Sequence, residues 1–268
     1  MNAEPSKILL LSMPFGALNR QALGISLLKA ALLERHVACD LRYFTFDFAE
    51  FIGLEDYQWI NFELPYTAFA GDWIFTQALY GARDSQDTAY IKEVLFETWQ
   101  LEPAAVKRLK AVRAKVEGFL DYCLDVVPWH EYKMVGFTST FEQNIASLAL
   151  AKRLKAKFPH LSIVFGGANW EATMGLELHK QFEFVDYVCS GEAEESFPAL
   201  VDVVLHDQLE FLGTIPGIVY RQDQTSISTG LPHLIKNMDS LPMPDYSDFF
   251  FAARAFRHQH TDHTKFIV

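Results

Sequence analysis

The chain has 268 residues, of which half are hydrophobic and 14% are aromatic, and its formal net charge is −11. This composition supplies a full hydrophobic core and excludes a disordered chain, while the acidic balance excludes a basic surface for nucleic acid. The sequence contains no apolar run of the roughly 18 residues that a membrane helix needs and no secretory signal pattern, so we expect neither a membrane partner nor export.

The first elements alternate between strand and helix. Lys7 to Met13 is a short continuous apolar run that ends at Pro14-Phe15-Gly16, which predicts a buried parallel strand. Asn19 is expected to cap the helix that follows, because its side chain accepts hydrogen bonds from first-turn amides. Val37 to Phe46 alternates between apolar and polar residues, which is typical of an edge strand.

The segment from residue 47 to about residue 130 breaks this rhythm and predicts a helical insertion. Helical patterns follow one another without a clear strand, and they cover Asp47–Ile60, Gly71–Tyr80, Thr88–Gln100 and Pro103–Val127. The insertion is rich in aromatic side chains, including Phe62 and Tyr66. We expect most of these aromatic side chains to form a core and a few to line the wall of a ligand pocket.

The alternation resumes after the insertion. Three further strands are predicted, each followed by a helical pattern, over Met134–Phe137, Leu161–Phe165 and Val185–Cys189. Thr140 with Gln143, or Ser139 with Glu142, has the spacing of a capping box at the start of a helix. A small hairpin is predicted over Ile218–Arg221 and Ser226–Ser228. The chain from Lys236 onwards contains two prolines and predicts an irregular linker on the surface.

These elements together predict an α/β protein with a parallel sheet of five strands, right-handed crossovers and a helical insertion. Small residues follow the strands that end at Met13, Phe137, Phe165 and Cys189. In an open parallel sheet these four turns share the carboxyl edge, where ligands bind. Gly166 and Gly167 leave bare backbone against which a large flat ligand can lie. A side chain at Gly167 is therefore expected to occupy the ligand's space.

The sequence shows no catalytic acid, base or nucleophile. It lacks the glycine-rich dinucleotide fingerprint, the nucleoside-triphosphate loop and the nucleophile elbow. Glu192, Glu194 and Glu195 precede a helix, where the helix dipole favours anions. The group His258, His260 and His263 lies in the predicted tail, and we expect no metal there. The three cysteines lie far apart without iron–sulfur spacing, which is typical of a reduced cytoplasmic protein.

Several short stretches together resemble a known family. They are Met13-Pro-Phe-Gly, Leu23-Gly-Ile-Ser-Leu-Leu-Lys-Ala-Ala-Leu, Val135-Gly-Phe-Thr-Ser-Thr-Phe-Glu-Gln-Asn, Phe165-Gly-Gly-Ala-Asn, Ser190-Gly-Glu-Ala-Glu, Pro216-Gly-Ile-Val-Tyr-Arg and Leu241-Pro-Met-Pro-Asp-Tyr. The chain resembles the N-terminal half of cobalamin-dependent radical S-adenosylmethionine enzymes. Within this family it is most similar to the C-methyltransferases that mature ribosomally synthesised peptides.

The resemblance implies a flavodoxin-like, Rossmann-like domain over residues 1–235 that binds hydroxo- or methylcobalamin. The corrin ring would lie at the carboxyl edge of the sheet, and the nucleotide tail would run into the sheet. The positions that the resemblance assigns to the cofactor are Pro14, Phe15, Gly16, Ala17, Leu18, Gln21, Thr138, Ser139, Thr140, Phe141, Asn144, Gly166, Gly167, Ala168, Asn169, Trp170, Gly191, Glu192, Ala193 and Glu194.

Three of these positions depart from the family pattern. Gln21 stands where related proteins carry the histidine that binds cobalt from below, so we expect no protein ligand to cobalt. Ala193 stands where glycine is common, which narrows that loop by a methyl group. Trp170 is bulkier than expected after Gly-Gly-Ala-Asn, and it packs either against the ligand or in the core.

The resemblance also implies partners. Residues 236–268 would form a linker toward a radical S-adenosylmethionine barrel, which would hold S-adenosylmethionine and a 4Fe–4S cluster. Because this chain lacks the cysteines for that cluster, we expect it to transfer no methyl group alone. A precursor peptide is the expected substrate of the whole enzyme. Two alternatives remain: a corrinoid-free module that binds a peptide through the aromatic insertion, and a flavin- or nucleotide-binding regulator.

Overall fold

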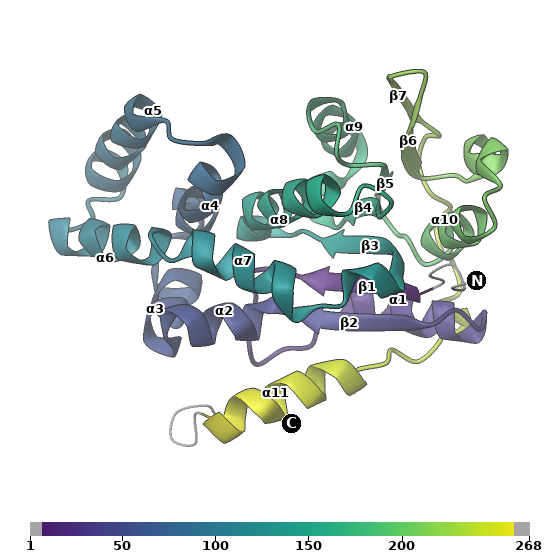
Figure 1. Cartoon of the computed structure of the whole chain (residues 1–268), viewed down its shortest axis with the longest axis horizontal. Helices are drawn as coiled ribbons and strands as arrows, with labels where there is room; N and C mark the ends of the chain where they lie inside the picture. The colour runs from purple at the N-terminus through teal and green to yellow at the C-terminus, as the bar shows by residue number, and fades with distance from the viewer. Residues whose placement is uncertain (1–6, 260–268) are drawn as a thin grey trace.

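A single mixed sheet forms the centre of the computed structural model, which describes residues 7–259 and the side chains of residues 7–257 (Figure 1). Its strands are β1 (Lys7–Ser12), β2 (Cys39–Tyr43), β3 (Tyr132–Thr138), β4 (Ser162–Gly166), β5 (Tyr187–Cys189), β6 (Ile218–Gln222) and β7 (Thr225–Ser228). Their order across the sheet is β2-β1-β3-β4-β5-β6-β7. The strands β1 to β5 are parallel, as the sequence predicts.

The sheet has seven strands and not five, because the predicted hairpin joins it. β6 pairs antiparallel with β5, with Val188 opposite Val219, and β7 continues the sheet. Without β6, the strand β5 would present unpaired backbone groups at an open edge. At the other end, β2 is the edge strand that the sequence predicts, but it stops at Tyr43 because a helix begins at Phe44.

Helices cover both faces of the sheet. On one face lie α1 (Leu23–Glu34) and α10 (Ser196–Leu205), which contact each other, and on the other lie α8 (Asn144–Lys157) and α9 (Ala172–Gln181) (Figure 1). Asn19 does not cap α1: the N-cap is Ala22, which makes no side-chain hydrogen bond. The capping box before α8 is confirmed, because Gln143 Oε1 accepts from the Thr140 N–H at 3.2 Å.

The insertion is helical, as predicted, and it forms a lobe beside the sheet (Figure 1). Its elements are α2 (Phe44–Ile52), α3 (Leu54–Gln58), the π-helical η1 (Trp59–Glu63), the 3₁₀-helical η2 (Tyr66–Ala68), α4 (Ala70–Tyr80), α5 (Asp84–Ala89), the π-helical η3 (Tyr90–Thr98), α6 (Pro103–Arg113) and α7 (Val116–Val126). Phe48 contacts both Phe75 and Phe119 in a fully buried aromatic cluster. Fewer of the aromatic side chains of residues 47–130 are buried than expected. The buried ones are Phe48, Tyr57, Trp73, Phe75, Phe119 and Trp129, and the exposed ones are Phe51, Phe62, Tyr66, Phe69, Tyr80, Phe96 and Tyr122.

The last described element is a helix that the sequence did not predict, α11 (Ser247–Gln259). It lies against β2 and α2, where Phe249 and Phe256 are buried. An ion pair of 3.1 Å between Lys29 of α1 and Asp245 fixes the chain just before this helix. The expected irregular linker therefore ends at Ser247. The candidate tail histidines His260 and His263 lie outside the described residues.

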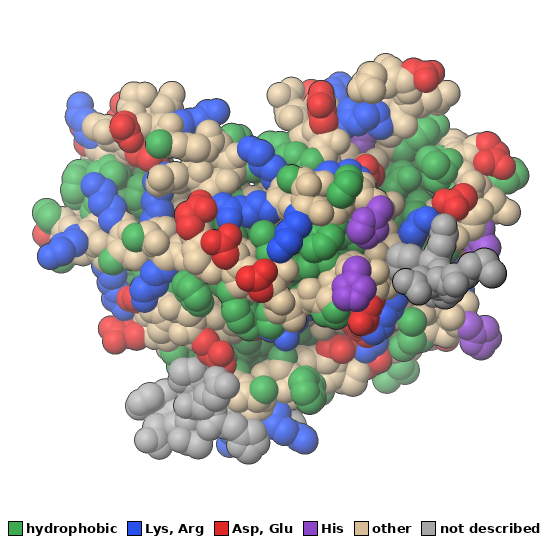
Figure 2. Space-filling model, in the orientation of Figure 1, with side chains coloured by type: hydrophobic (Ala, Val, Ile, Leu, Met, Phe, Trp, Pro, Cys, Tyr) green, Lys and Arg blue, Asp and Glu red, His purple; other side chains and the backbone are tan. Residues whose placement is uncertain are grey.

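Acidic and basic side chains are interspersed over the face shown in Figure 2. This mixture agrees with the net charge of −11, which leaves no excess of cations. Among residues 7–259, no helix combines the length and the apolar character that crossing a bilayer requires.

Candidate functional site

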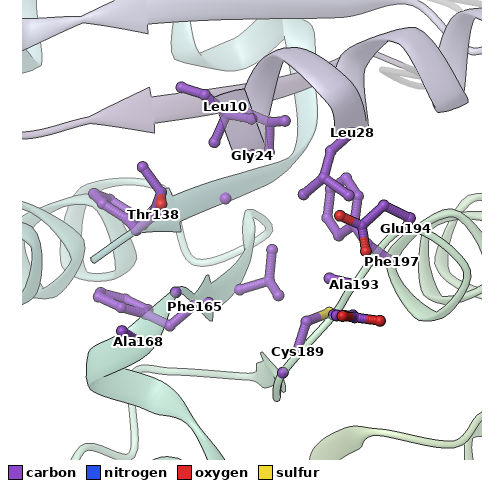
Figure 3. A pocket seen from close by; sticks show the side chains of 18 of the residues that line it. Leu10, Gly24, Leu28, Thr138, Phe165, Ala168, Cys189, Ala193, Glu194 and Phe197 are labelled. Atoms are coloured by element: carbon purple, nitrogen blue, oxygen red, sulfur yellow. The ribbon is translucent and has the colours of Figure 1, made fainter. Parts of the chain in front are cut away.

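Two adjoining cavities open at the carboxyl edge of the sheet. The narrow cavity, of about 410 Å³, lies between α1, α10 and the sheet (Figure 3). The wide cavity, of about 790 Å³, lies beyond the ends of β1 and β3. The two share Gly24, Ile25, Thr138 and Gly167 as lining residues. Because the strand order reverses between β1 and β3, the wide cavity occupies the topological switch point of the sheet, where ligands of open α/β folds bind.

The floor of the narrow cavity is made by neighbouring strands in register. Leu10, Gly136 and Val164 are direct neighbours on β1, β3 and β4. A Cβ atom at Gly136 would lie 2.5 Å from Leu10 Cδ2, so the flanking side chains use the space that this glycine leaves. Glycine inside a strand often marks a close approach of this kind. The sequence reasoning missed Gly136, although a glycine within the apolar run Met134–Phe137 was a signal.

The roof of the narrow cavity contains a second missed glycine, Gly24 in the first turn of α1. A Cβ atom at Gly24 would meet no protein atom within 4 Å. The position lines both cavities, so any side chain there would extend into their shared space. Gly24 therefore keeps the junction of the two cavities open.

Gly167 is required for a reason that differs from the one expected. Its φ is +92°, and a Cβ atom there would lie 2.6 Å from the carbonyl oxygen of Ser139. A side chain at this position would thus collide with the neighbouring loop before it reached a ligand. Gly167 also lines both cavities, so a side chain there would disturb this loop in addition to the space that the sequence assigns to a ligand.

Four of the predicted cofactor contacts bind one another instead of lining a cavity. Asn169 Nδ2 donates to Ser139 Oγ at 3.0 Å and to the carbonyl of Phe141 at 2.9 Å. Trp170 Nε1 donates to Asn144 Oδ1 at 2.9 Å, and the indole ring is fully buried against Phe165. Of the two placements expected for Trp170, the structure shows the core. This network joins the loop after β3 to the loop after β4.

Most of the other predicted residues line the cavities. In the narrow cavity they are Thr138, Gly166, Gly167, Ala168, Gly191, Glu192, Ala193 and Glu194, and in the wide cavity they are Phe15, Gly16, Ala17, Gln21, Thr138, Thr140, Phe141 and Gly167. Pro14 and Leu18 are buried beneath the first loop and line neither cavity. All four predicted turns therefore meet at this site, although not every residue in them faces it.

The narrow cavity has an acidic lining. Its charged lining residues are Glu171, Glu192 and Glu194, and no lysine or arginine is among the described residues that line it. Glu192 accepts a hydrogen bond of 3.3 Å from the Ile235 N–H. Glu194 Oε2, in contrast, is buried and has no hydrogen-bond partner in the structure. A buried acceptor without a donor is rare in native proteins.

The wide cavity contains a titratable carboxyl group, Glu142, which is 7% exposed. The pKa of Glu142 is raised to about 7: burial is the largest cause, backbone hydrogen bonds from the Gly71 and Ala70 N–H groups oppose it, and the nearby Asp72 carboxylate acts in the same direction as burial. Asp72 in turn accepts from the Ile145 N–H at 2.9 Å. Burial also raises the pKa of Asp72, to about 6. Glu142, in the short 3₁₀ helix η5 (Phe141–Gln143) just before α8, thus binds first-turn amides of α4, and Asp72 of α4 binds a first-turn amide of α8.

The insertion contributes the outer wall of the wide cavity, as expected from its aromatic content. Asn61, Phe62 and Tyr66 line it, and the Tyr66 ring lies 6.3 Å from the ring of Phe141 across the cavity mouth. Phe62 and Phe141 are 56% and 72% exposed, so these rings form an open apolar rim.

No group of three or more potential metal ligands lies together among residues 7–257, and no histidine of that range lines either cavity. Cys39, Cys123 and Cys189 are free and buried on β2, α7 and β5. Burial raises the pKa of the Cys189 thiol to about 12, which makes it a poor nucleophile.

Comparison with known proteins identifies the fold. No protein-family model matches the chain, and no curated protein matches it. Among solved structures it resembles the cobalamin-dependent S-adenosylmethionine radical enzyme OxsB with aqua-cobalamin and S-adenosylmethionine bound, at 13% identity and a TM-score of 0.52. OxsB with aqua-cobalamin alone aligns at 12% identity and a TM-score of 0.53. The chain shares this fold.

The alignment covers 95% of this chain and 26% of the OxsB chain, so the chain spans about a quarter of that enzyme. The radical S-adenosylmethionine methyltransferase TsrM from Kitasatospora setae, with cobalamin and a [4Fe–4S] cluster bound, aligns at 14% identity and a TM-score of 0.43 over 89% of this chain and 31% of its own.

Proposed function

We propose that the chain is a cobalamin-binding domain, and the observation that carries the proposal is the pair of adjoining cavities at the switch point of the sheet. The parallel part of the sheet has the order β2-β1-β3-β4-β5, which is the flavodoxin-like order. Each cavity lies within the roughly 300–1,000 Å³ of an ordinary small-molecule site. Two such cavities with shared lining residues fit a ligand that has a broad ring and a separate tail.

The chemistry of each cavity supports an assignment of the two ligand parts. The wide cavity, lined by Phe15, Gly16 and Thr140, would hold the corrin ring and its amide side chains. The narrow cavity, with its floor of Leu10, Gly136 and Val164, would hold the apolar base of the nucleotide tail. Gly24 leaves the junction between the two cavities open. Glu194 Oε2 has no hydrogen-bond partner in the protein, so a donor on the ligand can bind it.

The lining charges argue against the flavin or nucleotide alternative. A flavin mononucleotide or a dinucleotide brings phosphate groups that need backbone amides and cations. The narrow cavity offers three glutamates and, among the described residues that line it, no cation, while Arg20 lines the wide cavity. The single phosphodiester of cobalamin brings one negative charge, fewer than either alternative ligand, together with a positively charged metal centre and many neutral amides, so cobalamin suits this lining better.

We further propose that the chain acts with a radical S-adenosylmethionine barrel as a peptide C-methyltransferase in the cytoplasm. The proposal rests on the alignment with about a quarter of OxsB, because the remaining length of such an enzyme would hold S-adenosylmethionine and the 4Fe–4S cluster. The exposed rim of Phe62, Tyr66 and Phe141 offers apolar contacts to a peptide at the mouth of the wide cavity. The free cysteines fit a reducing compartment.

The colour of the purified protein after ligand loading tests the proposal. Incubation with aquacobalamin followed by desalting should leave one corrin per chain, measured by its visible absorbance. Flavin mononucleotide treated in the same way should be removed. Loss of all corrin absorbance would contradict the proposal: retained flavin would then indicate the regulator, and a colourless protein that retains a precursor peptide would indicate the peptide-binding module.

A further inference from the structure

Glu194 is the residue of the narrow cavity whose bonding the protein leaves incomplete. It lies in the loop between β5 and α10, and its carboxyl group points toward Leu28 of α1 and Phe197 of α10 (Figure 3). Oε2 is buried there without a hydrogen-bond partner. Because an unsatisfied buried acceptor is costly, this atom requires a donor that reaches it from inside the cavity.

The neighbouring acidic residues do not share this feature. Glu192 accepts from the Ile235 N–H, and it is exposed. Glu195 is also exposed, and it lies 3.6 Å from His233 on the outer side of the loop, away from the narrow cavity. Among the three glutamates of this loop, Glu194 is therefore the one that lines the narrow cavity and also has a buried carboxylate oxygen without a hydrogen-bond partner.

The surroundings of Glu194 define the class of donor. Glu194 lines the same cavity as the apolar, glycine-rich floor, which suits a flat aromatic base. No cation lies among the described lining residues, so a phosphate oxygen is not the matching group at this point. A sugar hydroxyl attached to an aromatic base supplies both features at once, and carboxylates bind ribose hydroxyls in other α/β nucleotide sites.

We propose that the Glu194 carboxylate accepts a hydrogen bond from a ribose hydroxyl in the nucleotide tail of the cofactor. This inference rests on the proposed cobalamin-binding function. It assigns the specificity for the tail to one carboxylate in the narrow cavity, and it leaves binding of the corrin ring to the wide cavity.

Two corrinoids that differ in the tail test this inference. Aquacobalamin carries the nucleotide, and diaquacobinamide has the same corrin ring without it. Each is titrated into wild-type protein and into Glu194→Ala and Glu194→Gln, with Kd measured by absorbance.

Glu194→Ala should raise the Kd for aquacobalamin by roughly ten- to a hundredfold, which is the range for a hydrogen bond to a charged group. Its Kd for diaquacobinamide should change less than about twofold. Glu194→Gln, which keeps one acceptor oxygen, should fall between wild type and Glu194→Ala.

Glu195→Ala is the matched control, because it removes the same charge from the same loop outside the cavity; its Kd values should equal those of wild type. The thermal midpoint of ligand-free Glu194→Ala should not fall, because the carboxylate makes no bond there. Equal weakening of both corrinoids, or no weakening of either, would overturn the inference while the proposed function stands. Wild-type protein that binds neither corrinoid would overturn the proposed function itself.

Discussion

The hydroxyl group of Tyr57 binds both backbone groups of Gly16. It accepts from the Gly16 N–H at 2.9 Å and donates to the Gly16 carbonyl at 2.7 Å. Tyr57 lies in the insertion, on α3, and is fully buried, whereas Gly16 belongs to the loop after β1 that lines the wide cavity. The insertion therefore fixes the shape of the first ligand loop.

Replacing this hydroxyl should weaken both the fold and the binding of cobalamin. Tyr57→Phe keeps the ring that packs on Phe15 and Phe48 but leaves the Gly16 N–H without its partner, and the Gly16 carbonyl keeps only the 3.4 Å bond from Asn61 Nδ2. We expect a loss of about 1–2 kcal/mol in the free energy of unfolding. We also expect a several-fold rise in the Kd for aquacobalamin, because the loop must then be ordered on binding.

Tyr90→Phe is the control for that variant. The Tyr90 hydroxyl donates to the carbonyl of Ala68 at 2.7 Å, so its removal costs a similar bond in the same insertion, away from Gly16. Denaturant unfolding should show comparable destabilisation for both variants, and absorbance titration should show weaker binding for Tyr57→Phe alone. Equal Kd values for the two variants would refute a positioning role for Tyr57.

Gly24→Leu should abolish cobalamin binding without destabilising the protein. The Cβ atom of the new side chain would meet no protein atom within 4 Å. Replacing a glycine in the first turn of a helix also raises the free energy of unfolding by up to about 0.5–1 kcal/mol. The same side chain would fill the junction that the narrow and wide cavities share. Retained corrin absorbance after desalting, with a wild-type thermal midpoint, would show that the ligand does not pass this junction.

Ala104→Leu on α6 introduces the same side chain at an exposed position outside both cavities, and this variant should bind cobalamin like the wild type. Gly167→Leu is a poorer test of the site. The Ser139 carbonyl blocks its Cβ at 2.6 Å, so loss of binding in that variant would also follow from a distorted loop.

The stability of the ligand-free protein should fall as the pH rises through neutrality. Burial raises the pKa of Glu142 from its ordinary 4.5 to about 7, so the folded state holds this proton more tightly than the unfolded chain. The resulting stabilisation is complete below about pH 4.5 and is lost as the pH rises through about 7, at up to about 1.4 kcal/mol per pH unit. Asp72 contributes in the same direction between its ordinary pKa of 3.8 and about 6.

Glu142→Gln removes this titration and keeps an oxygen that can accept from the Gly71 N–H. Denaturant unfolding at pH 5, 6, 7 and 8 should therefore show the wild type losing stability relative to Glu142→Gln as the pH rises. Glu183→Gln changes an exposed carboxyl group and should run parallel to the wild type. Parallel curves for wild type and Glu142→Gln would mean that Glu142 is already ionised in the folded protein at pH 5.

The part of the site that local patterns predict well is the set of four turns. A buried parallel strand is a nearly continuous apolar run, and the runs before Gly166 and before Thr138 stop abruptly at small residues. The capping box of Thr140 and Gln143 is also local, because its two partners are three residues apart. Such features depend on short stretches of chain, so one sequence suffices to find them.

The features that the sequence did not predict depend on distant packing. Gly24 and Gly136 matter because α1 and β3 face each other across a cavity, which neither local sequence reveals. Trp170 follows a glycine-rich turn of the kind that binds ligands, but its indole ring packs against Phe165 in the core and donates a hydrogen bond to Asn144. The helix α11 packs on the sheet through Phe249, whose ring contacts Tyr43 and Phe46. These residues are about two hundred positions apart in the chain, so the local sequence with its two prolines predicts only an irregular linker.

The last prediction concerns the face of cobalt that would lie toward the protein. Gln21, which the sequence resemblance aligns with a cobalt-binding histidine of related proteins, lines the wide cavity, and no histidine of residues 7–257 lines either cavity. An amide is a poor cobalt ligand beside imidazole. If the nucleotide tail occupies the narrow cavity, its own base is also held away from the metal. We therefore expect a cobalamin whose lower face carries neither its own base nor a histidine nitrogen.

Electron paramagnetic resonance of the cobalt(II) form should show no superhyperfine splitting from an axial nitrogen. The variant Gln21→His is the matched test: it should introduce that splitting if position 21 faces cobalt. Splitting in the wild type would disprove the prediction, and its absence from Gln21→His would place position 21 away from the metal.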